Sequence, residues 1–173
     1  FMDYHPIFKT LLGVVVAIQF TVPALIGALV AMKFDLSPLA IAVVASAAYV
    51  GSGAAQFKNG AWMITGIGDL INTMITAAIA VLFILLIQHR VGSMALIVFP
   101  TVVGGISGAI GVLILPYTKM ITTAIGNMVN GFTELQPIVM SILISMVFSL
   151  IIISPLSTVA IAFAIGITGL AAG

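Results

Sequence analysis

The chain has 173 residues, of which 62% are hydrophobic and 5% are charged, and its formal net charge is +1. A soluble domain usually carries about 25% charged residues, so this composition excludes a water-surrounded globule and predicts a protein surrounded by a lipid bilayer. The few scattered lysines and arginines exclude nucleic acid as a partner. The absence of cysteine excludes disulfides and cysteine metal sites, and no metal or other cofactor is expected.

Charged and turn-forming residues interrupt the apolar sequence at about the 20-residue interval that a transmembrane helix needs. Apolar runs without alternation, such as residues 79–87, argue against a β-barrel. The sequence predicts an all-α polytopic integral membrane protein with about six transmembrane helices or half-helices. The predicted spans cover residues 11–32, 36–55, 66–87, 91–115, 137–154 and 156–173. Because the chain ends within an apolar run, we expect residues 1–173 to be a single membrane-embedded domain of a longer chain.

Prolines are expected to mark kinks or breaks in these helices, because proline removes a backbone donor. They are Pro23, Pro100, Pro116, Pro137 and Pro155. Gln19 and Thr21 beside Pro23 make the first span a candidate for a broken helix of the kind that builds transporter sites.

Residues 116–136 differ from the predicted spans. Apolar residues follow the 3.6-residue period, and threonine and asparagine fill the other face. Such a helix either lies at the membrane interface, as a re-entrant or interfacial segment, or lines a polar cavity.

A weak internal repeat is present, because residues 68–72 resemble residues 126–130 and each segment precedes a long apolar span. The match indicates either a true repeat, as in secondary transporters, or the chance similarity of apolar sequences. Small residues gather at residues 45–55 and 104–111, which indicates either tight helix packing or a sliding, backbone-lined solute path.

Asp69 lies at the start of the third predicted span. Its carboxylate either caps the helix N-terminus or faces a cavity or partner, as membrane-embedded ionisable residues usually do. Asn72 and Thr76 follow on the same helix face, so a polar stripe could continue inward from the cap.

Glu134 is the sole glutamate, and it precedes an apolar span in which Ser141, Ser145 and Ser149 share one face. Carboxylate and hydroxyl groups together suit a neutral polyol such as a sugar. The alternative is an interfacial glutamate in water, with the serines bonded to their own helix.

Residues 130–145 and 155–173 resemble the EIIC-like membrane proteins of the bacterial phosphotransferase system, in particular a branch of stand-alone transporter-subunit-IIC proteins. The segment Gly131-Phe132-Thr133-Glu134 resembles the family's Gly-Ile-Thr-Glu motif, with phenylalanine replacing isoleucine. The resemblance implies that Glu134 binds sugar hydroxyls and that the protein lies in the cell inner (plasma) membrane as a multi-pass protein. The family also uses a histidine near the sugar, to which neither His5 nor His89 corresponds, and this chain contains no EIIB domain.

We therefore expect a transporter subunit that moves a small polar solute, such as a sugar, by alternating access of a rigid unit against a scaffold. The expected ligands are Glu134, Asn130, Gln136 and Ser141, with Asn72 and Asp69 as second candidates. No catalytic residue is expected, so the chain is not an enzyme by itself and at most forms the membrane component of a sugar phosphotransferase system. The expected partners are separate EIIA and EIIB proteins and a second copy, as a homodimer.

Two alternatives remain open from the sequence. One is a regulatory or structural membrane protein that retains the fold without phosphorylation-coupled transport. The other is a carrier of an amphipathic solute, for which the expected mark is a cavity lined by methionine and phenylalanine rather than by asparagine and serine.

Overall fold

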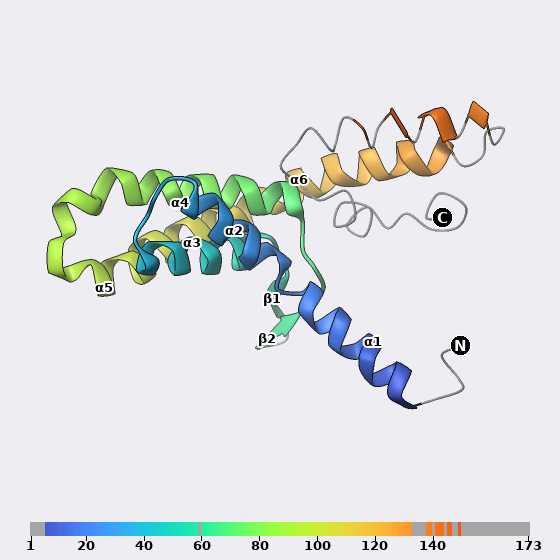
Figure 1. The fold of residues 1–173 in the computed structure, drawn as a ribbon. Helices are drawn as coiled ribbons and strands as arrows, with labels where there is room; N and C mark the ends of the chain where they lie inside the picture. Colours follow the sequence, from blue (N-terminus) through green and yellow to red (C-terminus); the bar gives the residue numbers. More distant parts are fainter. Residues whose placement is uncertain are drawn as a thin grey trace.

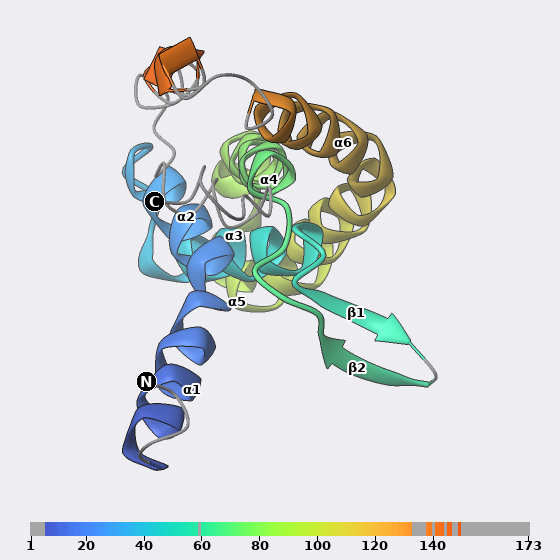
Figure 2. The same ribbon diagram turned by 90° about the vertical axis from the view of Figure 1, so that its right-hand side faces the viewer.

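The computed structural model describes residues 6–58 and 60–132, together with a few single residues and short pieces between 138 and 149. The described chain is mostly helical, as predicted, with a bundle of helices from which α1 and a small β-hairpin project (Figures 1 and 2). The elements in chain order are α1 (Pro6–Gln19), α2 (Val22–Met32), α3 (Pro38–Gly51), β1 (Ala55–Lys58), β2 (Ala61–Ile64), α4 (Leu70–Val91), the 3₁₀ turn η1 (Gly92–Met94), α5 (Ala95–Val98), the π-helical segment η2 (Phe99–Gly104) and α6 (Gly105–Phe132).

Two helical stretches, Ile7–Met32 and Leu70–Met128, are long and apolar enough to cross a membrane. The second stretch folds back on itself: α4 runs to one end of the bundle, the chain turns through η1 and α5, and η2 with α6 returns beside α4 (Figure 1). The 14 residues of α3 give it a length of about 21 Å, which is shorter than the bilayer core. The helix of the second predicted span is therefore too short to cross the bilayer core completely.

The first predicted span is broken, as the sequence indicated. Helix α1 ends at Gln19, and α2 begins at Val22. Pro23 explains the position of the break, because a proline ring clashes with the carbonyl four residues earlier, which is that of Gln19. The side chain of Thr21 closes the last turn by donating a hydrogen bond to the Ile18 carbonyl at 2.7 Å. Beyond this break α1 points away from the bundle (Figures 1 and 2).

The core lies where α2, α3, α4 and η2 meet, and small side chains dominate it. At Gly27, α2 approaches α3 so closely that a methyl group there would lie 2.7 Å from the Cβ of Ala48. Small residues permit such close contacts between membrane helices. The buried apolar residues include Ala31, Ala40, Val43, Val44, Ala47, Ala48, Ala77, Ala80, Val81, Ile84, Phe99 and Val103.

Among the described residues, the β-hairpin is the element that departs from the all-helical prediction. Strands β1 and β2 pair antiparallel, with Phe57 opposite Trp62, and the two rings meet edge to face at 5.6 Å between centroids. The dipeptide Asn59-Gly60 between the strands is a strong hairpin signal. The hairpin extends out of the bundle between the end of α3 and the start of α4 (Figure 2).

The prediction that the fourth span ends at residue 115, with a separate segment from 116, is wrong. Helix α6 continues through Pro116 to Phe132. Pro116 leaves only the Val112 carbonyl without its usual helical donor, and proline is tolerated inside membrane helices. The repeat is not matched in conformation, because residues 68–72 form a loop and helix start whereas residues 126–130 lie within α6. The fifth and sixth predicted spans lie outside the continuously described residues.

Candidate functional site

Asp69 is the N-cap of α4, as one of the two interpretations held. Its Oδ1 accepts a hydrogen bond from the backbone N–H of Asn72 at 2.8 Å, which satisfies a helix donor that would otherwise lack a partner. Its Oδ2 accepts a hydrogen bond from the Thr122 hydroxyl of α6 at 2.6 Å. The side chain is 4% exposed. Asp69 therefore joins the start of α4 to α6 as well as capping α4.

Asn72, one turn into α4, lies at the point where α3, α4 and α6 meet. Its side-chain amide donates to the Gly51 carbonyl of α3 at 2.6 Å and to the Gly111 carbonyl of α6 at 2.8 Å. Gly51 is the last residue of α3, and carbonyls at a helix end lack helical donors. The Asn72 side chain therefore connects both neighbouring helices to α4. We call Gly51, Asp69, Asn72, Gly111 and Thr122 the polar junction.

Glycine is required at two positions of the polar junction by close approach of the backbones. A methyl group on Gly111 would lie 2.7 Å from the Cα of Gly51, and one on Gly51 would lie 2.5 Å from the Thr76 hydroxyl oxygen. Thr76 is buried and donates its hydroxyl hydrogen to the Asn72 carbonyl at 2.8 Å. Any larger residue at either glycine would push the helices apart.

Two buried polar atoms near this level of the bundle have no hydrogen-bond partner among the described residues, namely Oδ1 of Asn72 and Oγ of Ser107. Ser107 lies one helical turn before Gly111 on α6. A buried unpaired acceptor costs about 1–3 kcal/mol. The polar junction therefore keeps unused hydrogen-bonding capacity in an apolar interior. Within the described ranges, no cluster of three or more acidic or histidine side chains could hold a metal ion.

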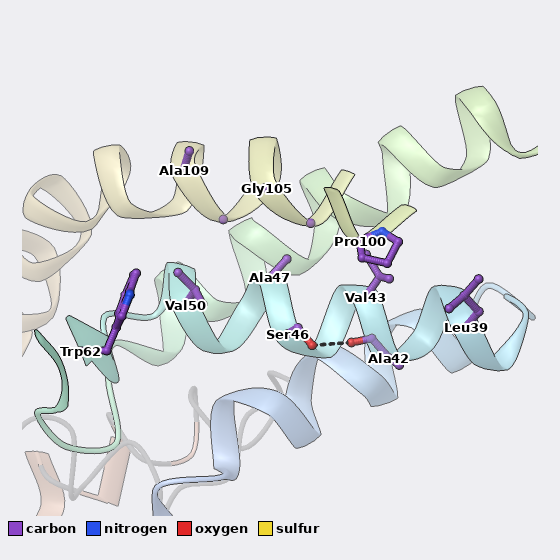
Figure 3. Close-up of a pocket in the computed structure, with 12 residues that line it drawn as sticks. Leu39, Ala42, Val43, Ser46, Ala47, Val50, Trp62, Pro100, Gly105 and Ala109 are labelled. Carbon is purple, nitrogen blue, oxygen red and sulfur yellow. Dashed lines mark hydrogen bonds between the residues drawn. The ribbon is translucent and has the colours of Figure 1, made fainter. Parts of the chain in front are cut away.

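A groove of about 440 Å³ lies beside the polar junction, between α3 and the η2–α6 segment (Figure 3). Small residues of both walls leave it open, including Ala42, Ala47, Gly104 and Ala109. Its other lining residues are Leu39, Val43, Ser46, Val50, Trp62, Pro100, Gly105 and Gly108. The Ser46 hydroxyl donates to the Ala42 carbonyl at 2.8 Å, and Trp62 reaches the groove from β2 (Figure 3). We call this cavity the α3–α6 groove.

One wall of the α3–α6 groove has an irregular backbone. Pro100 lies in the π-helical segment Phe99–Gly104 and has no backbone N–H to donate. Turns of π-helix inside longer helices are frequent at functional sites. The groove thus combines an aromatic side chain, small walls and a proline-containing π-helical segment.

A second groove, of about 630 Å³, lies between α2 and α4. Met32, Phe34 and Met74 line it together with aliphatic residues of α2, and Lys33 lies at its edge. This lining has the composition that the sequence predicted for an amphipathic ligand. We call it the α2–α4 groove.

Asn130 and Ser141, the remaining predicted site residues that the structure describes, are not part of the polar junction. Asn130 is in the last turn of α6, and Ser141 is exposed, with its hydroxyl donating to the Ile138 carbonyl at 3.0 Å. Glu134 and Gln136 lie outside the described residues. From Thr122, which bonds Asp69, to Phe132 is about 15 Å along the helix axis. Asn130, near the end of α6, is therefore about two turns along this helix from the residue that bonds Asp69.

Sequence reasoning missed the roles of Gly51, Gly111 and Thr122 in holding the helices together. Both glycines belong to stretches already marked as rich in small residues, but the partner of each glycine is a distant side chain that sequence spacing does not reveal. Thr122 belongs to the polar face predicted for the segment that follows Pro116. That polar face was the sequence feature from which a contact of Thr122 with another helix could have been predicted.

A family model described as "Phosphotransferase system, EIIC" matches residues 1–173. No curated protein shows significant similarity to the chain, and no solved structure does so either. The match covers the whole length of the sequence and agrees with a helical, strongly apolar protein in which several polar side chains, such as Asp69 and Asn72, are buried between helices. The chain therefore belongs to the EIIC family of the phosphotransferase system, which implies a membrane protein of sugar transport.

Proposed function

We propose that this chain translocates a sugar by alternating access, and that the α2–α6 bundle moves as one rigid unit against a separate scaffold. The observation that carries this proposal is the polar junction, in which Asp69 and Asn72 connect three helices through buried hydrogen bonds. Alternating access needs a part that moves without deforming. Helix α1, which is separated from the bundle by the break before α2, would belong to the scaffold.

The energetics support a rigid bundle. In a bilayer, helix association depends on packing and interhelical hydrogen bonds, and each such bond contributes about 0.6 kcal/mol on average and up to about 1.7 kcal/mol. The polar junction has three interhelical bonds around one turn of α4. They act together with the close approach of Gly51 and Gly111, so separating α6 from α3 would cost both bonds and packing.

Solute recognition would fall to the last turn of α6 and the residues that follow it. By the resemblance of Gly131-Phe132-Thr133-Glu134 to the family motif, Glu134 would accept hydrogen bonds from sugar hydroxyls. Asn130, Gln136 and Ser141 would assist it. Because Thr122 anchors α6 to Asp69, the segment that follows α6 would be carried with the bundle when the bundle moves. Asp69 and Asn72 would then be positioning residues, since their described partners are internal.

The α3–α6 groove is a second candidate for the solute path. A ligand site usually combines apolar and aromatic walls with a few polar groups, and Trp62 with the Ser46 hydroxyl supplies that combination. A sugar would place its apolar ring face against the indole and a hydroxyl toward Ser46.

Transport by the purified protein in liposomes tests the proposal, with a broad sugar panel and with and without EIIA, EIIB and a phosphoryl donor. We expect Glu134→Gln to reduce uptake at least tenfold, whereas the loop variant Asp35→Asn leaves uptake unchanged. Failure to move any sugar would favour a protein that keeps the fold without transport. Unchanged uptake by Glu134→Gln would remove Glu134 as a ligand.

A matched pair of tryptophan variants separates the two candidate solute sites. Ala109→Trp fills the α3–α6 groove, and Ile106→Trp places the same side chain on the exposed face of the same helix outside the groove. Loss of uptake with Ala109→Trp alone would assign the solute path to this groove. Equal uptake by both variants would exclude it.

The EIIC family implies partners of the phosphotransferase system and a membrane location. We further propose separate EIIA and EIIB proteins as those partners, a homodimer as the assembly, and a multi-pass arrangement in the inner membrane. Crosslinking in native membranes would test the dimer.

A further inference from the structure

The α2–α4 groove plays no part in the transport proposal, and its chemistry differs from that of the α3–α6 groove. Its walls are aliphatic or thioether side chains from the last two turns of α2 and one side chain of α4: Ile26, Leu29, Met32 and Met74. Phe34 lies just beyond the end of α2. Among the residues that line it, the one charged group is Lys33. The groove therefore has an apolar body and a cationic edge.

The position of Lys33 in the chain places this edge near a membrane surface. Lys33 directly follows the apolar stretch Ile7–Met32, which is long enough to cross a bilayer, and it is the C-cap of α2. Lysine at the end of a membrane helix extends its ammonium group toward the lipid headgroups. The apolar body of the groove then extends from the headgroup level into the hydrocarbon.

The charge of Lys33 is available to a ligand. The side chain is exposed, and no ion pair of Lys33 occurs among the residues that the structure describes. Asp35, two residues along the chain, is exposed but does not line the groove. A cation at the end of α2 also interacts favourably with the partial negative charge of the helix C-terminus, which holds the ammonium group close to the groove.

We propose that the α2–α4 groove binds one anionic phospholipid, with an acyl chain between α2 and α4 and the headgroup phosphate at Lys33. Methionine side chains adapt to a flexible chain better than branched ones do, and Met32 with Met74 lines the groove from its two helices. Basic residues beside clefts between membrane helices are a known physical basis for binding anionic headgroups. The bound lipid fills a space that the described residues leave open and supports the packing of α2 on α4.

Tryptophan fluorescence with brominated lipids tests the site directly. Trp62 is the sole tryptophan of the chain, so the double variant Trp62→Phe with Phe34→Trp places one fluorophore at the groove. The protein is reconstituted in phosphatidylcholine vesicles that contain increasing fractions of brominated phosphatidylglycerol or, separately, of brominated phosphatidylcholine. We expect phosphatidylglycerol to quench at lower mole fraction, and Lys33→Gln to reduce that preference about fivefold, as expected for loss of one lysine near an anionic surface.

Two further variants serve as controls. Lys33→Arg keeps the positive charge and should retain the preference. Lys58→Gln removes the same charge from the exposed hairpin, outside the groove, and should leave the preference unchanged. A second measurement keeps the native Trp62 and Phe34. The amount of phosphatidylglycerol that copurifies with the protein, measured by mass spectrometry, should fall with Lys33→Gln and not with Lys58→Gln.

Equal quenching by the two lipids, or equal effects of the two lysine variants, would overturn the proposal. So would the absence of quenching by either lipid, which would mean that protein, such as residues 133–173, fills the groove. None of these outcomes depends on sugar uptake, so the lipid site and the transport proposal can fail separately.

Discussion

Helices α1 and α4 are both strongly apolar, but they have opposite environments. In α1 the large side chains are exposed, with Ile7 and Ile18 each at 60%. In α4 the residues of one face are buried, and the first half of that face includes Asn72, Thr73 and Thr76 before aliphatic residues continue it. The helix with polar groups along its face is thus the one inside the bundle.

The difference reflects the solvent. Lipid tails are as apolar as a leucine core, so apolarity alone does not distinguish a lipid-facing helix from a buried one. Small residues allow close approach, and polar groups gain partners only where another helix lies beside them. In this chain small and polar residues of α3, α4 and α6 lie on the buried faces, whereas Gly13 and Ala17 of α1 are exposed.

The largest effect is expected from Gly111→Val. The added side chain would collide with the Gly51 backbone and with Thr76, so we expect the free energy of unfolding to fall by about 3 kcal/mol or more. The measurement is reversible unfolding in mixed micelles. Gly13→Val in α1 is the matched control, because Gly13 has no atom near its missing side chain. Equal losses at the two positions would show that the close approach of α3 and α6 is not important for stability.

An intermediate effect is expected from Asn72→Ala. This change removes two interhelical hydrogen bonds and leaves a small cavity, so we expect a loss of about 2 kcal/mol. The control, Gln19→Ala, removes an amide of similar size at the end of α1 and should change stability by less than about 0.5 kcal/mol. A loss below that limit for Asn72→Ala would contradict the role given to the polar junction.

The smallest effect is expected from Thr122→Val, which keeps the shape of the side chain and removes the hydroxyl bond to Asp69. We expect a loss of about 1 kcal/mol in the same unfolding measurement. Thr123→Val is the control on the neighbouring, exposed position of α6. If both variants behave alike, α6 is held by packing alone.

The sequence allowed the broken first span and the capping role of Asp69 to be predicted, because both depend on local chemistry. Pro23 determines where α1 must end, and an aspartate before an apolar helix satisfies free N–H groups. The course of α6 through Pro116 could not be predicted in this way, since the contacts that keep this helix continuous come from α3 and α4. The hairpin was predictable from Asn59-Gly60, but we interpreted that signal only as the end of a span.

Among the candidate ligands, Asp69 and Asn72 were correctly placed on one helix face, yet their partners Gly51, Gly111 and Thr122 come from positions up to 53 residues away. Periodicity along one helix cannot identify such partners. The proposed role of Glu134 rests on motif resemblance, and it stays a prediction.

Spin-label distances in liposomes test the rigid bundle most directly, because the chain has no cysteine to remove. Single cysteines at Leu82 of α4, Leu113 of α6 and Val14 of α1, all exposed, can be labelled in pairs. We predict a narrow Leu82–Leu113 distance distribution that becomes broad with Asn72→Ala, and a broad or bimodal Val14–Leu113 distribution in the unaltered bundle. A Leu82–Leu113 distribution as broad as that of Val14–Leu113 would contradict a bundle that moves as one unit.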